Sequence, residues 1–126
     1  MSFENMNGLE LMQAMAHGDL PPASISSTMG MNYGLEVEKG RFVMHVMADD
    51  RHINPLGGVH GGFAATVLDS VTGCVVHTML EVGVGYGTVD LNVKMMRPVP
   101  KNVKLTAEGK IINISKERTI DVMITR

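Results

Sequence analysis

The stretch that decides the fold is GVHGGFAATVLDSVTGCVVHTML, residues 58–80. The only formally charged residue in it is Asp69, and apolar or small side chains would cover nearly the whole circumference of a helix of this length. A helix that is apolar on all sides is a buried helix. The stretch therefore predicts a central helix from about Gly61 to Leu80, with the remainder of the chain packed around it.

On both sides of this helix, apolar residues recur at every second position, which is typical of half-buried strands. Before the helix, residues 33–37 and 41–48 alternate on either side of Lys39-Gly40, a turn signal that predicts a β-hairpin. After the helix, three more alternating runs predict an antiparallel meander with one dry face and one wet face. These runs are residues 88–95, 103–111 and 120–125.

The outline is that of an α+β protein. Residues 5–17 carry apolar side chains at helical spacing and are followed by Gly18, so a short helix is expected there, and residues 22–27 are expected to be a connector. Strands grouped around one central helix predict an antiparallel sheet wrapped on that helix. The length suits a single domain, 1–126. A last strand that ends near Arg126 leaves an open edge, which predicts either a further strand missing from this sequence or cover by a partner chain.

Composition and charge exclude several classes of protein. A chain that is 44% hydrophobic and 19% charged can bury a core, and the lone Cys74 cannot form a disulfide scaffold. A net charge of −2 and the absence of Trp argue against a nucleic-acid partner. No apolar run is long enough for a membrane span and no signal-peptide pattern is present, so we expect no membrane partner and a cytoplasmic location. The histidines show no metal-ligand spacing, so no metal is expected.

Asp69 is the residue of the central helix that needs an explanation. A lone carboxylate among apolar side chains is costly unless it is paired or hydrogen-bonded. One interpretation is structural: the carboxylate caps a neighbouring loop or pairs with an Arg or Lys. The other is chemical, because desolvation disfavours the charged form and makes a carboxylate a better general base near neutral pH. The residue by itself leaves both interpretations open.

The sequence Gly58-Val59-His60-Gly61-Gly62 leads into the same helix. Free N–H groups and the positive end of the dipole make a helix N-terminus a site for negative charge, and glycine lets a ligand approach the backbone closely. A developing oxyanion would fit there. The plainer interpretation is a loop that needs glycine to enter the helix, with His60 as a structural hydrogen-bonding group.

Helix geometry constrains how these groups could work together. Gly61 and Asp69 are eight residues apart, which is about 12 Å along a helix at ~1.5 Å per residue. A general base must lie within about 3 Å of the group that it deprotonates. Asp69 therefore cannot easily serve a carbonyl bound at the N-terminus of its own helix, whereas two chains related by a two-fold axis could supply one group each.

Several motifs, taken together, resemble the hotdog-fold acyl-CoA thioesterases of the phenylacetate-degradation type. They are Asn54, His60-Gly61-Gly62, Asp69, the run Gly87-Thr88-Val89-Asp90-Leu91-Asn92-Val93 and Arg97-Pro98. The resemblance covers most of the chain, from about residue 10 to residue 126. It implies a hotdog fold, in which an antiparallel sheet wraps around one long central helix.

The resemblance also implies a role for each residue of the motifs. The Gly61 N–H would polarise the thioester carbonyl, Asn54 would hold that carbonyl or the attacking water, and Asp69 of the other protomer would be general base or nucleophile. Thr88 would orient the water, and His60 would support the loop. No cofactor is implied, since coenzyme A is part of the substrate, and the expected assembly is a homodimer or a dimer of dimers.

The substrate is less closely defined. The phosphates of coenzyme A need cations, for which Arg97, Lys101 and Arg118 are candidates by charge alone. The chain has twelve methionines, which are flexible fillers of apolar space. Aryl and medium-chain acyl groups both suit a slot lined by Met and Val.

Two other functions stay in consideration. A hotdog 3-hydroxyacyl thioester dehydratase would need a His at the position that Pro55 holds here, and His52 lies 17 residues before Asp69, so the spacing argues against it. A non-catalytic acyl-CoA sensor would carry a DNA-binding module. The segment before the first predicted strand has no Lys or Arg, which does not suit a basic recognition helix.

Overall fold

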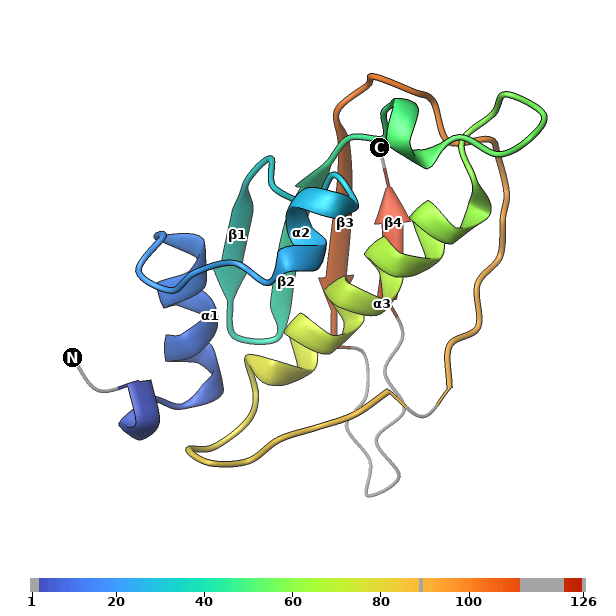
Figure 1. Cartoon of the computed structure of the whole chain (residues 1–126). Coiled ribbons are helices and arrows are strands. Elements are labelled where there is room, and N and C mark those ends of the chain that lie inside the picture. The colour runs from blue at the N-terminus through green and yellow to red at the C-terminus, as the bar shows by residue number, and fades with distance from the viewer. Residues whose placement is uncertain (1–2, 89, 112–121, 126) are drawn as a thin grey trace.

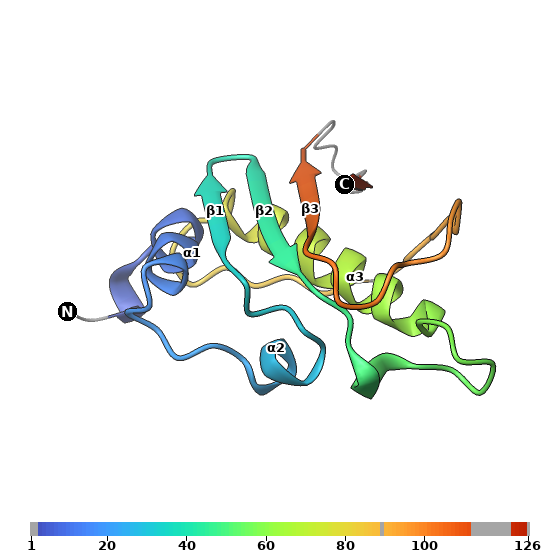
Figure 2. The ribbon, with the colours of Figure 1, turned by 90° about the horizontal axis from the view of Figure 1, so that it is seen from above.

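The chain folds as an antiparallel sheet with a long helix across one of its faces. The computed structural model describes residues 3–88, 90–111 and 122–125. Its strands are β1 (Leu35–Glu38), β2 (Arg41–Val46), β3 (Leu105–Lys110) and β4 (Val122–Thr125). They form one sheet in the order β1-β2-β3-β4, and α3 (Gly61–His77) lies across it, as Figure 1 and Figure 2 show from two sides. The α+β class that the sequence predicts is confirmed.

One side of α3 carries an apolar ridge that fixes its place on the sheet. Phe63, Val67, Val71 and Val75 are four positions apart and at most 3% exposed. Residues at this spacing stack on one face of a helix. The ridge packs against side chains from the inner face of β2 and β3: Phe42, Met44, Val46, Leu105 and Ala107. Burying each large side chain of the ridge contributes about 1.5–3 kcal/mol, so the ridge dominates the packing of α3.

The remaining sides of α3 do not match the prediction of a helix buried all round. Ala64, Leu68 and Val76 each follow a ridge residue, about 100° further round the helix, and are only half-buried within this chain. The composition of the helix shows how much apolar surface it carries, but a single sheet can cover only one side of it. Within the three described ranges, no helix is both long and apolar enough to cross a bilayer.

The predicted hairpin is confirmed, and it also marks where α3 ends. β1 and β2 pair around Lys39-Gly40, and Gly40 has the positive φ of 78° that such a turn favours. The Gly40 N–H donates to the hydroxyl oxygen of the buried Thr78 at 2.9 Å, and that hydroxyl donates to the Val75 carbonyl at 2.6 Å. The helix therefore ends at His77, three residues before the predicted end, where Thr78 ties it to the turn.

The prediction of a strand over residues 88–95 is wrong for the part of it that the structure describes. Residues 88 and 90–100 return along α3 as irregular chain (Figure 1). An alternating pattern indicates a segment with one apolar side, but a strand also needs a neighbouring backbone to pair with. The other two predicted strands are present as β3 and β4, and the polar turn expected at residues 115–118 lies outside the described residues.

The N-terminal helix is confirmed as α1 (Gly8–Ala16), preceded by the 3-10 turn η1 (Phe3–Asn5). α1 begins with a capping box, in which Asn7 accepts from the Glu10 N–H and Glu10 accepts from the Asn7 N–H. It packs against β1 and α3, and the Gly8 N–H donates to the Leu80 carbonyl at 2.9 Å. α1 therefore closes the end of the sheet where α3 terminates.

The expected connector before β1 contains a short helix, α2 (Ser24–Thr28), so that prediction is wrong. A five-residue helix has little stability of its own. α2 is held by hydrogen bonds from the loop that contains the 3-10 turn η2 (Asp50–His52), and these tertiary contacts leave no local sequence pattern.

Gly8→Ala tests the docking of α1. A Cβ at Gly8 would overlap the backbone carbonyl oxygen of His77, so the substitution should lower the free energy of unfolding by about 1–3 kcal/mol. Gly85→Ala is the control, because a Cβ at Gly85 meets no atom within 4 Å. Urea titration followed by circular dichroism measures both variants. Equal stabilities for the two would contradict the close packing of α1 on α3.

Candidate active site

The N-terminus of α3 presents a backbone N–H with no acceptor among the described residues. Gly61 is the first residue of the helix and is exposed, and none of the described groups accepts from its N–H. The next N–H groups are used: Gly62 donates to His60 Nδ1 at 2.7 Å, and Phe63 donates to the His60 carbonyl at 3.0 Å. The predicted oxyanion donor is therefore available at the positive end of the helix dipole.

His60 is the N-cap of α3. Its Nδ1 accepts a hydrogen bond, so this nitrogen carries no proton in this arrangement. Its backbone N–H donates to the His52 carbonyl at 2.7 Å, which joins the start of α3 to the preceding loop. Two hydrogen bonds of His60 thus hold the Gly61 amide in place. One joins the His60 side chain to the Gly62 N–H, and the other joins the His60 N–H to the His52 carbonyl.

Asn54 is oriented by its own loop. Its Oδ1 accepts from the backbone N–H groups of Leu56 at 2.9 Å and Gly58 at 3.1 Å. The amide nitrogen Nδ2 has no acceptor within the described ranges and is the group that remains to contact a ligand. Asn54 can therefore donate to a carbonyl oxygen or to a water, while its oxygen is occupied by the loop.

Asp69 and Thr88 are brought together within one chain. The Thr88 hydroxyl donates to Asp69 Oδ1 at 2.9 Å. Asp69 is half-buried rather than fully buried, and no Arg or Lys among the described residues pairs with it. The interpretation of Asp69 as half of an ion pair is therefore not supported, and its second oxygen, Oδ2, stays available to a ligand.

Tyr86 and Cys74 lie close to the part of α3 that carries Asp69. Tyr86 packs on Gly73 and meets the His77 ring edge-on, with ring centroids 5.6 Å apart. Burial raises the pKa of Tyr86, and the nearby Cys74 and Asp69 raise it further. Burial also raises the pKa of Cys74 to about 11, so Cys74 is a neutral thiol near pH 7. The raised pKa values mean that neither Tyr86 nor Cys74 supplies an anionic group to this stretch near neutral pH.

The two halves of the predicted site do not meet within one chain. Gly61 and Asp69 lie on the same unbroken helix, about 12 Å apart along its axis at ~1.5 Å per residue. Gly61 is accompanied by Asn54 and His60, and Asp69 is accompanied by Thr88. The residues of the predicted site are therefore divided between two places on one chain.

The hydrogen bonds of His52 hold the loop that precedes α3. His52 is 6% exposed, its Nδ1 accepts from the Asp49 N–H at 3.0 Å, and its Nε2 donates to the Thr28 carbonyl at 2.7 Å. Both ring nitrogens are used, so His52 is not free to act as the histidine of a dehydratase. Arg51 donates to the Ser27 carbonyl at 2.7 Å, and together these residues attach the site loop to α2.

The cationic candidates lie apart from one another. Lys101 forms an exposed ion pair with Asp50 at 2.9 Å, and Arg97 lies on the irregular segment after α3, where no described carboxylate pairs with it. Arg118 is outside the described residues. The three cations are therefore not shown to form a common phosphate site.

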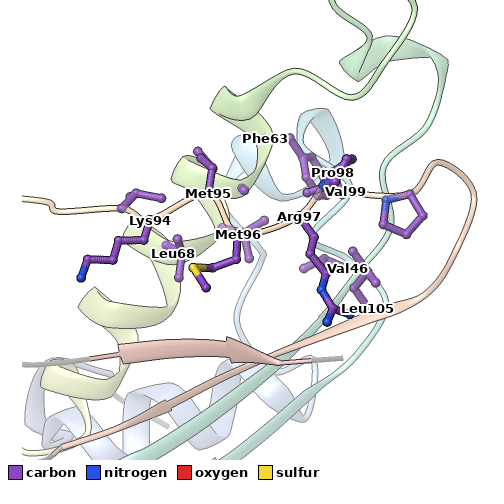
Figure 3. Close-up of a pocket in the computed structure, with 14 residues that line it drawn as sticks. Val46, Phe63, Leu68, Lys94, Met95, Met96, Arg97, Pro98, Val99 and Leu105 are labelled. Carbon is purple, nitrogen blue, oxygen red and sulfur yellow. The ribbon is translucent and has the colours of Figure 1, made fainter.

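A pocket opens beside Gly61, at a place that the sequence did not predict. It holds about 260 Å³ and lies between the first half of α3 and the irregular segment 93–100 (Figure 3). Met95 lines it, and the Met95 Cε lies 3.4 Å from where a Cβ of Gly61 would be. No motif marks the pocket, because its two walls come from segments that are distant in sequence.

Comparisons with known proteins show the family and the fold of the chain. The sequence profile of the thioesterase superfamily matches residues 56–120. Among solved structures, the chain is similar to a phenylacetic acid degradation-related protein from Ralstonia eutropha JMP134, with 26% identity, a TM-score of 0.73 and coverage of 83% of this chain and 80% of that chain. It is also similar to the PaaI protein of E. coli, from the phenylacetic acid degradation operon, with 16% identity, a TM-score of 0.69 and coverage of 86% and 75%. That second likeness shows the fold alone, and the predicted hotdog fold is confirmed.

A curated relative gives a weaker match. A predicted esterase from Caenorhabditis elegans is 27% identical over 84 residues, which are 67% of this chain. The chain spans about half the length of that relative, 49%.

His52→Leu tests whether this side chain holds the site loop. The substitution leaves the Thr28 carbonyl and the Asp49 N–H without their partners in a partly buried place, so the free energy of unfolding should fall by about 1–3 kcal/mol. His17→Leu is the control, because His17 is exposed and should change stability by less than about 0.5 kcal/mol. Urea denaturation compares the two. A loss in His52→Leu no larger than in His17→Leu would show that these hydrogen bonds do not stabilise the fold.

Proposed function

Because the chain belongs to the thioesterase superfamily, we propose that it hydrolyses the thioester bond of an acyl-coenzyme A and releases the free acid and coenzyme A. The observation that carries the proposal is the uncommitted Gly61 N–H at the N-terminus of α3. Such a donor favours the negative charge that develops on the carbonyl oxygen during attack on a thioester. The Asp69–Thr88 pair supplies the second requirement, a carboxylate held with one oxygen free.

In the proposed reaction, the carbonyl oxygen accepts from the Gly61 N–H, and Asn54 Nδ2 donates to the same oxygen or to the attacking water. Asp69 acts either as a general base, taking a proton from that water, or as a nucleophile that first forms an acyl anhydride. In both routes a carbon–oxygen bond forms, the carbon–sulfur bond breaks and the sulfur leaves as the coenzyme A thiol. The Thr88 hydroxyl donates to Asp69 Oδ1, so Oδ2 faces the water or the substrate.

We propose that the active enzyme is a homodimer or a dimer of dimers in which each site combines groups of two chains. The separation of Gly61 and Asp69 on one helix supports this, since a carbonyl held at Gly61 is out of reach of Asp69 of the same chain. Apolar side chains on the irregular segment after α3 are also exposed in the single chain, among them Val84, Tyr86 and Leu91. A second copy that paired with this segment would cover them and would supply the missing half-site.

The coenzyme A phosphates would require positive charge near the mouth of the site. Arg97 is the best placed of the proposed cations, because it lines the pocket beside Gly61 and no described carboxylate neutralises it. Lys101 already pairs with Asp50, so binding would have to compete with that exposed ion pair. Arg118 stays a candidate by charge alone.

Asp69→Asn tests the proposed chemistry. The amide keeps the size of the side chain and can still accept from Thr88, but it cannot take a proton or attack a carbonyl. The turnover of acyl-coenzyme A should fall by at least ~10²-fold, measured by release of the thiol. Asp90→Asn is the matched control, since Asp90 is an exposed carboxylate two residues beyond Thr88 and should keep its turnover.

The same variant separates the proposed role from a structural one. A lower melting temperature with an unchanged rate per folded molecule would mean that Asp69 serves stability and not catalysis. The two chemical roles are distinguished by a single turnover in heavy-oxygen water. A nucleophile can leave the label in the Asp69 carboxylate, whereas a general base sends it to the product acid.

Gly61→Pro removes the backbone N–H of residue 61, which is the proposed oxyanion donor. Proline is well suited to the first position of a helix, and His60 already has the extended conformation, ψ 136°, that the residue before proline prefers. The variant should fold and lose at least ~10²-fold in turnover. Gly61→Ala keeps the N–H and should lose less than about tenfold, so similar losses in both would remove the N–H from the proposed mechanism.

Mixing two inactive variants tests whether a site is shared between chains. If Gly61 and Asp69 act from different protomers, re-equilibrated Gly61→Pro and Asp69→Asn chains form mixed dimers with one intact site. The activity of the mixture should then rise towards about one quarter of the wild-type value. A mixture that stays inactive while sedimentation shows mixed dimers would contradict a shared site.

A further inference from the structure

Asp69, Gly73 and His77 lie on one face of α3, because they are four positions apart on the helix. Gly73 comes two positions after the ridge residue Val71, about 200° further round the helix, so this face points away from the sheet. Gly73 is nevertheless buried. The side chain that lies over it is that of Tyr86, from the irregular segment that returns along α3.

Gly73 is an unusual residue for the middle of a helix. Glycine is, after proline, the least favourable residue in a helix interior. Gly73 has helical geometry without the positive φ that would require glycine. A Cβ at this position would lie 2.5 Å from the hydroxyl oxygen of Tyr86 and 2.9 and 3.0 Å from two carbons of its ring. The absence of a Cβ therefore lets the aromatic ring lie directly on the helix.

The Tyr86 ring makes a second contact one helical turn further along. It meets the His77 ring edge-on, with an angle of 78° between the ring planes. Burial lowers the pKa of His77 and raises the pKa of Tyr86, so both rings are uncharged near pH 7. Aromatic rings favour this edge-to-face arrangement. Gly73 and His77 together therefore fix where the ring lies on α3.

The backbone on either side of Tyr86 has few other contacts. Gly85 and Gly87 flank it, and a Cβ at either position would meet no atom within 4 Å. No backbone group of residues 85–88 forms a hydrogen bond with another described residue. Glycine also gives the backbone more conformational freedom than any other residue. The ring of Tyr86 is therefore the contact that attaches this stretch to α3 just before Thr88.

The spacing of the two segments relates this contact to the candidate site. Asp69 lies one helical turn before Gly73, about 5.4 Å along the axis. Thr88 lies two residues after Tyr86, and two residues of chain span at most about 7 Å. With the ring on Gly73, the Thr88 hydroxyl therefore arrives at Asp69, to which it donates at 2.9 Å.

We propose that Gly73 and Tyr86 are positioning residues of the reaction: the ring lying on Gly73 sets the path of residues 86–88 along α3, and this path places the Thr88 hydroxyl on Asp69. A displaced ring would carry Thr88 out of hydrogen-bond distance and leave the carboxylate unoriented. This inference rests on the proposed function, since the orientation of Asp69 affects turnover only if Asp69 takes part in the reaction.

Gly73→Ala tests the proposal, because the added Cβ displaces the ring while alanine suits the helix itself. The substrate is octanoyl- or phenylacetyl-coenzyme A, whichever the wild type hydrolyses faster. The value of kcat should fall by at least about tenfold with KM changed by less than about twofold, as for a loss of orientation and not of binding. Tyr86→Leu should give the same result. Tyr86→Phe keeps the ring and should retain kcat, and Gly85→Ala is the matched glycine control.

A double-mutant cycle tests whether the effect passes through Thr88. In a Thr88→Ala background, Gly73→Ala should change kcat by less than about twofold, because the group that it positions is already absent. A full additional loss in that background would overturn the positioning role. So would a loss of kcat that merely follows a loss of the wild-type assembly in sedimentation.

The position of the ring is measured separately from activity. Tyr33 is the other tyrosine of the chain, so in a Tyr33→Phe background the ultraviolet absorbance of tyrosinate reports Tyr86 alone. Because burial raises the pKa of Tyr86, Gly73→Ala should lower it towards the ordinary value of about 10. An unchanged titration would overturn the contact, and a shifted titration with unchanged kcat would overturn the positioning role alone. A wild type that hydrolyses neither substrate would overturn the proposed function and, with it, the role in turnover.

Discussion

The packing of the apolar ridge of α3 on the sheet is the interaction on which the rest of the structure depends. Phe63, Val67, Val71 and Val75 turn one side of the helix towards β2 and β3 and exclude water from that side. The rotation of the helix about its axis is then set. Gly61 is left at an exposed N-terminus, and Asp69 faces Thr88 instead of the core. A different rotation would bury the carboxylate at high cost, so the core and the candidate site are consequences of the same packing.

The rigidity of α3 adds a second constraint. An unbroken helix holds Gly61 and Asp69 at a fixed separation, which side-chain motion cannot close. The proposed oxyanion donor and the proposed base or nucleophile of one chain are therefore too far apart to act on one bond. The half-buried outer side of α3 and the apolar irregular segment after it are the surfaces through which a second copy would bring the complementary group. Association and catalysis would then depend on the same residues.

The loop before α3 shows how much of a site consists of supporting contacts. His52 and Arg51 hold α2 through its last carbonyls, and the His52 carbonyl accepts from His60, which caps α3. The oxygen of Asn54 is used inside this loop, so its amide nitrogen is the polar atom of this side chain that has no partner among the described residues. These contacts fix the atoms that would touch a substrate. Their partners are backbone groups, which every residue carries, so no residue pattern reveals them in advance.

The sequence by itself determined the elements and the chemical groups. The period of the apolar residues predicts α3, the hairpin, β3 and β4, because each pattern follows from local geometry, and the glycines and the lone Asp69 mark the ends of the candidate site. Only the tertiary structure decided which side of α3 is buried, that residues 90–100 form no strand in this chain, that α2 is a helix, and that a pocket opens beside Gly61. Each of these depends on a backbone or side chain that is distant in sequence. A periodic pattern indicates that a segment has an apolar side, but it does not indicate which part of the fold that side packs against.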